Sequence, residues 1–253
     1  MAARLEGSIA IVTAGGQGIG ESISKLFAQE GASVAVVDFN KTEAERVAGE
    51  ITAAGGKAFA HIADVSRTET VTAMVKTVVE RFSTVDILVN AAGGFHQLAP
   101  ITEITDEEWD RVITMNLKTT FLCSRAVAPI MMERRKGRIV NIASGSGIAP
   151  NPFAPTYLPY GAAKAGVINF SKVLAKDLGQ YGITVNAISP GTTATPRVIK
   201  VRDEASRKKI ADQNPMRTLV EPQDSAEAAL FLASAAARYI TGVNLTVNAG
   251  NLM

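Results

Sequence analysis

Tyr160 and Lys164 are the two residues of this sequence whose types and spacing best suit acid–base chemistry. Residues four apart lie one turn apart on the same face of a helix. A free tyrosine has a pKa of about 10, too high for an efficient base at neutral pH, and a nearby ammonium lowers that pKa by favouring the phenolate. We therefore expect Tyr160 to exchange a proton with a reacting oxygen, with Lys164 lowering its pKa. The alternative is an ordinary helix pair in which the lysine stem lies along the helix surface.

A glycine-rich turn near the N-terminus is the second chemical signal. The apolar run Ile9–Thr13 leads into Ala14-Gly15-Gly16-Gln17-Gly18-Ile19-Gly20 and then into a helical pattern. Glycines in a strand-to-helix turn let the backbone approach a pyrophosphate, and the helix N-terminus offers N–H groups and a favourable dipole. The pattern G-x-G-x-x-G does not occur here, and a tight turn also needs glycine for steric reasons, so the turn alone is weak evidence.

Asp38 strengthens the prediction of a dinucleotide site. It follows the apolar run Val34–Val37, about 20 residues beyond the turn, where a carboxylate accepts hydrogen bonds from the adenosine ribose. A carboxylate there repels a 2′-phosphate, and the residue before Gly18 is the neutral Gln17. Both features favour NAD over NADP as the cofactor. The alternative role of Asp38 is a cap of the turn or helix that begins near Asn40.

Short apolar runs alternate with longer amphipathic stretches along the whole chain, which is the pattern of parallel strands joined by crossover helices. We predict strands at 9–13, 34–37, 58–62, 87–90, 138–142, 184–188 and 244–247. We predict helices near 19–30, 41–54, 67–81, 106–133, 158–180 and 222–234, with Thr105 capping the fourth. The expected fold class is α/β, with one doubly wound (Rossmann) seven-stranded parallel sheet and helices on both faces.

The chain contains no obvious linker, so we expect residues 1–253 to form a single dinucleotide-binding and catalytic domain. The segment from about 192 to 215 departs from the alternation, because it follows a strand, carries a dense set of Arg and Lys and ends in Asn-Pro. We interpret it as a small helical lid over the substrate, although a solvated charged helix also accounts for most of its charges.

Composition excludes several classes of function. A formal net charge of +2 in 253 residues argues against nucleic-acid or membrane partners. One cysteine, Cys123, rules out an intrachain disulfide, and the default location is the cytoplasm. The two histidines have no CxxC or HExxH spacing around them, so no metal site is expected.

Taken together, these and later motifs resemble the short-chain dehydrogenase/reductase family from end to end, including its NAD-dependent members and its 3-oxoacyl-acyl-carrier-protein reductase-like proteins. The segments that carry the resemblance occur in family order and at family-like spacing: Thr13–Gly20, Asp64-Val65, Asn90–Gly93, Met115-Asn116-Leu117, Asn141–Ser144, Tyr160–Lys164, Pro190-Gly191 with Thr195, and Ile240–Gly242.

The resemblance implies roles for individual residues. Tyr160 is the expected acid or base, Ser144 holds the substrate oxygen, Lys164 also holds the nicotinamide ribose, and Asn116 holds a water that links Lys164 to solvent. The implied contacts to the cofactor, NAD, come from Thr13, Gly15, Gln17, Gly18, Ile19, Gly20, Asp38, Asp64, Val65, Asn90, Ala91, Gly93, Tyr160, Lys164, Pro190, Gly191, Thr193 and Thr195.

Three positions depart from the family pattern. Ala14 replaces the first glycine of the turn, and Ala91 replaces the second asparagine of N-N-A-G. Ser144 lies 16 residues before Tyr160, a longer interval than the resemblance implies, so Ser146 is the reserve candidate for its role.

Substrate contacts are expected from the C-terminal ends of the strands and from the lid. The predicted substrate residues are Ser144, Ser146, Phe95, His96, Tyr157 and Arg197, with Asn151 and Phe153 as further pocket walls. Arg197 and Lys200 are candidates for an anionic group, such as a carboxylate or a thioester carrier. His96 has an alternative role as a loop residue with a local hydrogen bond.

We expect an oxidoreductase that moves a hydride between NAD(H) and a small secondary alcohol or ketone. One alternative is an NADPH-dependent ketone reductase of the 3-oxoacyl type, and another is a non-catalytic nucleotide-binding scaffold on the same fold. The resemblance also implies a homotetramer assembled through the helices at 106–133 and 158–180 and the C-terminal strand.

Overall fold

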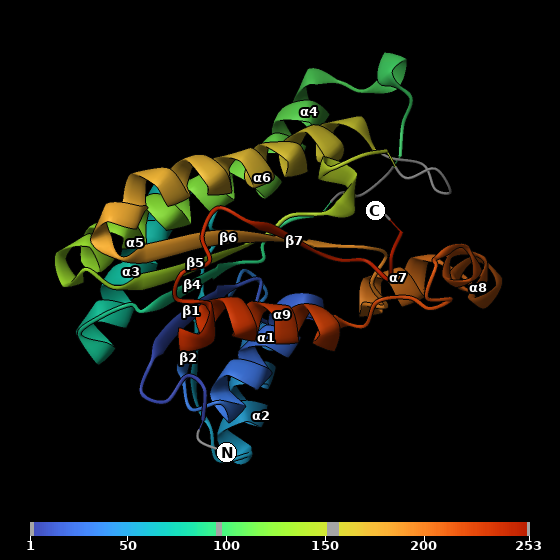
Figure 1. Cartoon of the computed structure of the whole chain (residues 1–253). Helices are drawn as coiled ribbons and strands as arrows, with labels where there is room; N and C mark the ends of the chain where they lie inside the picture. The colour runs from blue at the N-terminus through green and yellow to red at the C-terminus, as the bar shows by residue number, and fades with distance from the viewer. Residues whose placement is uncertain (1–2, 95–97, 151–156, 252–253) are drawn as a thin grey trace.

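The computed structural model describes residues 3–94, 98–150 and 157–251. Its seven strands form one parallel sheet in the order β3-β2-β1-β4-β5-β6-β7 (Figure 1). The strands are β1 Ile9–Thr13, β2 Ser33–Asp38, β3 Lys57–Ile62, β4 Ile87–Asn90, β5 Gly137–Ile142, β6 Ile183–Pro190 and β7 Asn244–Val247. Each of the seven predicted runs is therefore a strand, and the doubly wound fold class is confirmed.

The strand order reverses between β1 and β4, which are neighbours in the sheet although β2 and β3 lie between them in the sequence. In open α/β sheets, ligands bind outside the carboxyl ends of the strands at such a switch point. The glycine-rich turn follows β1 and the segment from Ala91 to Gly94 follows β4, so the fold brings these two segments to the same place.

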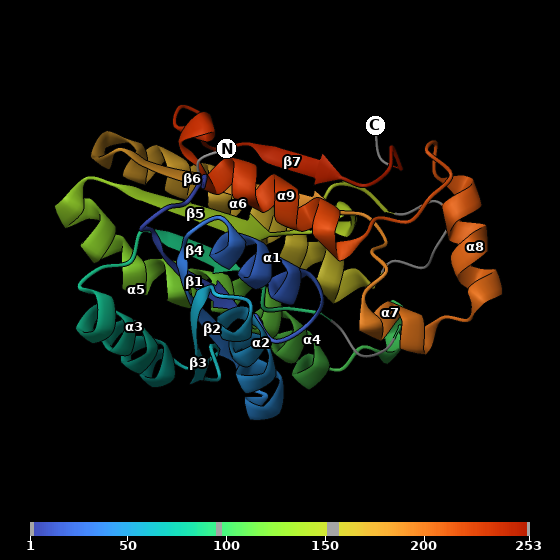
Figure 2. The same cartoon turned by 90° about the horizontal axis from the view of Figure 1, so that it is seen from below.

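Helices cover both faces of the sheet (Figures 1 and 2). The α-helices are α1 Gly18–Gln29, α2 Lys41–Ala53, α3 Thr68–Phe82, α4 Asp106–Ile113, α5 Thr119–Arg134, α6 Leu158–Leu178, α7 Pro196–Val201, α8 Glu204–Gln213 and α9 Pro222–Ala233. Helices α1, α2 and α9 pack on one face, and α3, α5 and α6 pack on the other. Because both faces are covered, β1, β2, β4 and β6 are buried along their whole length, which explains why the strands read as continuous apolar runs.

The predicted helix at 106–133 is interrupted. It begins as expected, with the Thr105 hydroxyl accepting a hydrogen bond from Glu108 N at 3.2 Å. A π-helical turn, η2 Thr114–Lys118, then separates α4 from α5. Such π turns are frequent at functional sites, and this one contains Asn116. An apolar pattern does not distinguish a π turn from the α-helix around it, so the sequence pattern predicted one continuous helix.

The segment predicted as a helical lid forms α7 and α8, which project beyond the carboxyl ends of the strands (Figures 1 and 2). Its two ends are paired with one another. A parallel bridge joins Thr193 to Val220, and Ala194 N donates a hydrogen bond to Val220 O at 2.8 Å. Helices α7 and α8 therefore lie in a segment whose two ends are joined to each other at the sheet.

Two further findings concern classes of function. No helix in the described part of the chain is long and apolar enough to cross a membrane. Within the same residues, no group of three or more His, Cys, Asp or Glu side chains could hold a metal ion.

Candidate functional site

A chain of buried polar side chains fixes the carboxyl ends of the two central strands. Asn90, at the end of β4, donates to Asn141 Oδ1 on β5 at 2.8 Å and to Ser124 Oγ on α5 at 3.2 Å. Asn141 in turn donates to Ser171 Oγ on α6 at 2.8 Å. Buried networks of this kind favour one arrangement of their members, and here only Asn90 Oδ1 is without a hydrogen-bond partner among the atoms of the network. The network therefore holds α5 and α6 at a fixed position relative to the ends of β4 and β5.

Tyr160, Lys164 and Ser144 converge at that end of the sheet. Tyr160 and Lys164 lie on the first turns of α6, and Ser144 follows β5. The hydroxyl of Ser144 is hydrogen-bonded to Tyr160, and it also accepts from Ser146 N at 3.2 Å. The Lys164 ammonium lies 5.7 Å from the centre of the Tyr160 ring. The structure thus brings together the three residues that the sequence predicted as neighbours, and Ser144 rather than Ser146 is the serine hydrogen-bonded to the tyrosine.

Lys164 is buried, with 3% of its surface exposed, and its Nζ donates to the carbonyl oxygen of Ile142 at 2.8 Å. Burial lowers the pKa of Lys164 to about 8, because desolvation disfavours the charged form. An ammonium that can lose its proton near neutral pH is suited to passing protons as well as to binding hydroxyl groups.

Tyr160 has a pKa above its ordinary value, because desolvation by the surrounding protein outweighs the groups that favour the phenolate. The groups that lower the pKa are the hydrogen bond from Ser144 and the positive charge of Arg197. The sequence predicted Lys164 for this effect, and that role stays a prediction. Lys164 directs its Nζ to the Ile142 carbonyl, which the residue types alone did not indicate.

Asn116 holds the segment that follows β4. Its amide Nδ2 donates to Gly94 O and its Oδ1 accepts from Gly94 N, both at 2.8 Å. Gly93 and Gly94 adopt φ angles of +152° and +139°, a region that side chains disfavour. A Cβ on Gly93 would lie 3.0 Å from Lys164 Nζ, and one on Gly94 would lie 2.5 Å from Arg197 Nη1. These two glycines therefore let both cations approach the backbone, and sequence reasoning missed Gly94, for which the tandem glycine was the available signal.

The glycine-rich turn fits a dinucleotide phosphate. Gly18 has a φ of +57°, and the residue that precedes α1, Gln17, makes no side-chain hydrogen bond to the helix N-terminus. The first N–H groups of α1 thus have no side-chain cap, which is the arrangement that an anion completes. Gly18 lies next to the start of α7, because a Cβ on Gly18 would be only 3.3 Å from Thr195 Cγ2. Ala14, at the first position of the turn, adopts a left-handed backbone conformation with a φ of +48°, which glycine adopts more readily than alanine.

Asp38 supports this turn directly. Its side chain is 3% exposed, and its oxygens accept from Gly16 N at 3.1 Å and from Asn40 N at 3.0 Å. The Asp38 carboxylate thus caps the turn at Asn40 and also lies at the end of β2, beside the glycine-rich turn. Both roles that the sequence left open for Asp38 remain compatible with this geometry.

The cations beside the turn are paired with glutamates. Arg46 on α2 forms ion pairs with Glu21 at 3.0 Å, with Glu43 at 2.8 Å and with Glu50 at 2.9 Å, and it donates to Gly16 O at 3.0 Å. Lys25 pairs with Glu21 and Glu50, both at 2.6 Å. The pKa of Arg46 is accordingly raised, first by its hydrogen bond to Glu21. Three carboxylates and two cations leave this end of the site with a net negative charge before Asp38 is counted.

The other predicted cofactor residues occupy different environments. Thr13 uses its hydroxyl within the protein, accepting from Ala91 N at 3.0 Å and from Ala92 N at 3.2 Å. Asn90 is engaged in the buried network, whereas Asp64 is exposed. The following residues lie in the turn, after β3, β4 or β6, or at the start of the lid: Gly15, Ile19, Gly20, Val65, Ala91, Pro190, Gly191, Thr193 and Thr195. Their contacts with a cofactor stay predictions.

Of the predicted substrate residues, Phe95, His96, Asn151 and Phe153 lie outside the described residues. Ser146 lies beside Ser144, and Arg197 lies beside Gly94.

Tyr157 is a different case from these, because it is 2% exposed and its hydroxyl donates to Glu108 Oε1 at 2.9 Å. Arg111 holds the same carboxylate through two hydrogen bonds of 2.7 Å. Tyr157 therefore links the start of α6 to α4, a contact that the sequence did not indicate.

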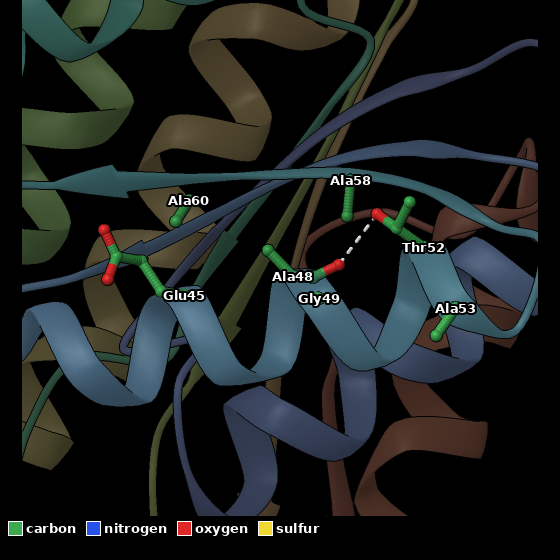
Figure 3. Close-up of a pocket in the computed structure, with 7 residues that line it drawn as sticks. All are labelled: Glu45, Ala48, Gly49, Thr52, Ala53, Ala58 and Ala60. Atoms are coloured by element: carbon green, nitrogen blue, oxygen red, sulfur yellow. Dashed lines mark hydrogen bonds between the residues drawn. The ribbon is translucent and has the colours of Figure 1, made fainter.

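A hollow elsewhere on the molecule lies between α2 and the edge strand β3 (Figure 3). It is lined mainly by the small residues Ala48, Gly49, Ala53, Ala58 and Ala60, and the Thr52 hydroxyl is bonded to the Ala48 carbonyl at 2.9 Å. None of the predicted site residues lines it. The chemistry of this chain is therefore concentrated at the carboxyl ends of β1, β4 and β5.

Comparisons with known proteins agree with this geometry. A family model described as enoyl-(acyl carrier protein) reductase matches residues 13–251. The 3-oxoacyl-[acyl-carrier-protein] reductase FabG of Thermotoga maritima is 36% identical over 247 residues, covering 98% of each chain. The FabG protein of Staphylococcus epidermidis is 40% identical over 245 residues, covering 96% of this chain and 98% of the relative.

A solved structure, that of gox2181, superimposes with a TM-score of 0.94 at 32% identity, covering 99% of this chain and 97% of that one. The shared fold, the near-complete coverage and the identity of more than a third establish the relationship. The chain belongs to the short-chain dehydrogenase/reductase family, whose members act as oxidoreductases on CH–OH groups or ketones with a nicotinamide cofactor.

Proposed function

We propose that this protein transfers a hydride between NAD(H) and a secondary alcohol or ketone, with Tyr160 as the acid or base. The observation that carries the proposal is the Ser144–Tyr160 hydrogen bond beside the buried ammonium of Lys164, at the switch point of the sheet. Proton transfer by a positioned side chain is what oxidation of an alcohol requires in addition to a hydride acceptor.

The nicotinamide ring, when bound, accepts or supplies the hydride. During oxidation, Ser144 donates a hydrogen bond to the substrate oxygen and the deprotonated form of Tyr160 takes the hydroxyl proton. During reduction, Tyr160 returns a proton to the carbonyl oxygen, whose developing negative charge the same two hydroxyls stabilise. Lys164 lies close enough to Gly93 to bind a ribose hydroxyl, and its pKa of about 8 lets it replace the proton on Tyr160. Asn116, whose amide donates to Gly94 O and Val112 O, is expected to hold a water that links Lys164 to solvent.

The preference for NAD is supported by charge at the adenosine end. Asp38 lies against Gly16, and the neighbouring cations Arg46 and Lys25 are already paired with glutamates. A 2′-phosphate would bring further negative charge to a region that is already negative, without an unpaired cation among these residues to receive it. The same argument favours the oxidative direction under conditions in which NAD⁺ is abundant.

A second candidate function is ketone reduction of the 3-oxoacyl type, because the curated relatives at 36% and 40% identity carry that name. The charges around Asp38 oppose its usual cofactor, NADPH. Substrate and cofactor preference therefore need to be measured together.

We also propose a homotetramer. A groove on the outer surface of η2, α5 and α6 is lined by Leu117, Phe121, Phe170 and Val173, and Phe121 and Val173 are 41% and 53% exposed. An apolar strip on two long helices is suited to burial against a second copy. Light scattering of the wild type and of Phe121→Glu tests it, since the charge is expected to reduce the assembled mass.

The decisive experiment titrates NAD⁺ and NADP⁺ into the wild type, Asp38→Asn and Glu45→Gln. The asparagine keeps the size and an acceptor for Gly16 N but removes the charge. We expect the wild type to bind NAD⁺ at least tenfold more tightly than NADP⁺, and Asp38→Asn to lose most of that ratio. Glu45→Gln, an exposed carboxylate on α2, is the matched control and should behave as the wild type. A wild type that prefers NADP⁺ would move the reductase candidate to first place.

A further inference from the structure

Arg197 is the one charged side chain of the lid that the described contacts bring to the reaction centre. It lies on α7, it is exposed, and its Nη1 approaches the bare Cα of Gly94 so closely that a Cβ there would be only 2.5 Å away. Gly94 is held in turn by Asn116 through two hydrogen bonds of 2.8 Å. The position of the guanidinium is therefore set by the same segment that borders Lys164.

Two cations thus flank the segment after β4. Lys164 Nζ would be 3.0 Å from a Cβ on Gly93, and Arg197 lies over the next residue. An anion placed beside this segment would interact favourably with both charges. The positive charge of Arg197 also lowers the pKa of Tyr160.

We propose that Arg197 binds the carboxylate of a short hydroxy acid or keto acid, in which the reacting carbon is one or two bonds from the carboxylate carbon. This inference rests on the proposed function and names its substrate class. A guanidinium presents two parallel N–H groups that match a carboxylate, which fixes both the orientation and the distance of the group.

The location of Arg197 discriminates between acids and carrier-bound thioesters. In a 3-oxoacyl thioester, the atoms next to the ketone are uncharged, and the nearest phosphate is at the far end of the pantetheine arm. A cation held over Gly94 contributes nothing to the binding of that phosphate, whereas a carboxylate on C1 of a 2- or 3-hydroxy acid would lie close to the reacting carbon. The lid therefore favours a small anionic substrate.

The reaction balances without a further reactant. The C–H bond of the alcohol carbon breaks and its hydride passes to NAD⁺, while the hydroxyl proton passes to Tyr160 and then to solvent. The products are the keto acid, NADH and a proton. The carboxylate is unchanged and only orients the molecule.

The test compares acids with their methyl esters. Oxidation of 2-hydroxybutyrate, 3-hydroxybutyrate and the two methyl esters is measured with NAD⁺ in the wild type, Arg197→Gln, Arg197→Lys and Lys209→Gln. Lys209 is an exposed cation on α8 of the same lid and serves as the matched control. We expect at least one acid to exceed its ester tenfold in kcat/KM in the wild type. Arg197→Gln should lower kcat/KM for that acid about 50-fold and leave the ester within threefold, whereas Arg197→Lys should recover part of the loss.

A binding measurement separates this inference from the proposed function. Butyrate, which cannot be oxidised at a hydroxyl, is titrated calorimetrically into the NAD⁺-saturated wild type and Arg197→Gln. Binding by the wild type alone supports the anion site even if no alcohol is turned over, a result that would sink the proposed function but not the site.

Three results would overturn the inference. The first is equal kcat/KM for acids and esters in an active wild type. The second is an equal loss for both in Arg197→Gln with an alkaline shift of the rate profile, because Arg197 would then act only on the pKa of Tyr160. The third is butyrate binding that does not change in Arg197→Gln.

Discussion

The two ends of the candidate site differ in how their charged side chains are paired. At the adenosine end, Arg46 and Lys25 are each paired with glutamates, and Asp38 adds a further carboxylate. At the substrate end, Lys164 Nζ is bonded to the Ile142 carbonyl, and Arg197 lies over Gly94, which the Asn116 side chain holds. We therefore expect the adenosine end to disfavour an additional phosphate and the substrate end to accept negative charge.

The two ends also differ in the elements that carry their charges. At the adenosine end the charged side chains lie on α1, on α2 and at the end of β2, which belong to the scaffold. The substrate end depends on a side chain of a lid that projects beyond the sheet. Loops carried on a rigid scaffold tolerate substitution better than the elements of the scaffold do.

The largest expected effect comes from Tyr160→Phe, which breaks the substrate end alone. We expect kcat to fall by about 10²- to 10⁴-fold, the range for loss of a positioned acid or base. NAD⁺ affinity, measured by titration, should stay within about threefold of the wild-type value, because the adenosine end is untouched. Tyr157→Phe is the control: it removes the hydrogen bond to Glu108 but no group bonded to Ser144. Equal losses of kcat in the two variants would contradict the assignment of Tyr160.

The next largest effect is on the free energy of unfolding, and it arises from the burial of Lys164. Its pKa is about 8 in the folded protein and 10.5 in the reference state, so between these values the unfolded chain binds more protons than the folded one. The free energy of unfolding should therefore rise with pH, by about 1 kcal/mol between pH 8 and pH 9. Well below pH 8 the lysine is protonated in both states, so it does not change the free energy of unfolding with pH.

Lys164→Met provides the comparison for this pH dependence, because the apolar side chain has no proton to lose. Its curve, from denaturant titrations, should lack the rise. The window stops at pH 9 because the buried thiol of Cys123, with a pKa of about 12 against 9.0, acts in the opposite direction above that pH. If the two proteins gave parallel curves, Lys164 would be charged in the folded state throughout.

The smallest effect sharpens the comparison at the adenosine end. Arg46→Met removes the partner of three glutamates and the hydrogen bond to Gly16 O. Because the ion pairs are partly exposed, we expect NAD⁺ affinity to weaken by only about two- to fivefold, and the loss to shrink as salt is added. An affinity that does not change at low salt would show that these pairs have no effect on the cofactor.

Gly49→Ala is the matched control for that helix. A Cβ on Gly49 meets nothing within 4 Å, so the substitution should leave NAD⁺ affinity unchanged. Replacing a helical glycine with alanine should also raise the free energy of unfolding by about 0.5–1 kcal/mol.

Strands β1, β2, β4 and β6 were predictable because a strand buried on both faces must be apolar along its length, whereas the partly exposed edge strands β3 and β7 were located by the alternation of short apolar runs with helical stretches. All seven runs were located, and β1, β4 and β7 have the predicted bounds. The turn and Tyr160 were also accessible, since their chemistry is carried by residue types a few positions apart. The π turn around Asn116 was not, because the apolar pattern continues through it.

Contacts between segments far apart in the sequence could not be predicted either. The direction of the Lys164 side chain is decided by a carbonyl 22 residues away in the chain, and that of Tyr157 by Glu108, 49 residues away. The approach of Arg197 to Gly94 depends in the same way on the path of the lid. Spacing rules describe neighbours on one helix or strand, and they contain no information about these pairs.

The bridge between Thr193 and Val220 has a consequence for evolution and for engineering. Because the entry and exit of the lid are tied together, the segment between them forms a module whose removal or replacement leaves the ends of the sheet in register. Lengthening such a closed loop adds little entropic cost, since that cost grows only with the logarithm of loop length. Exchange of residues 196–219 between relatives is therefore a route to new substrate scope on an unchanged hydride-transfer site.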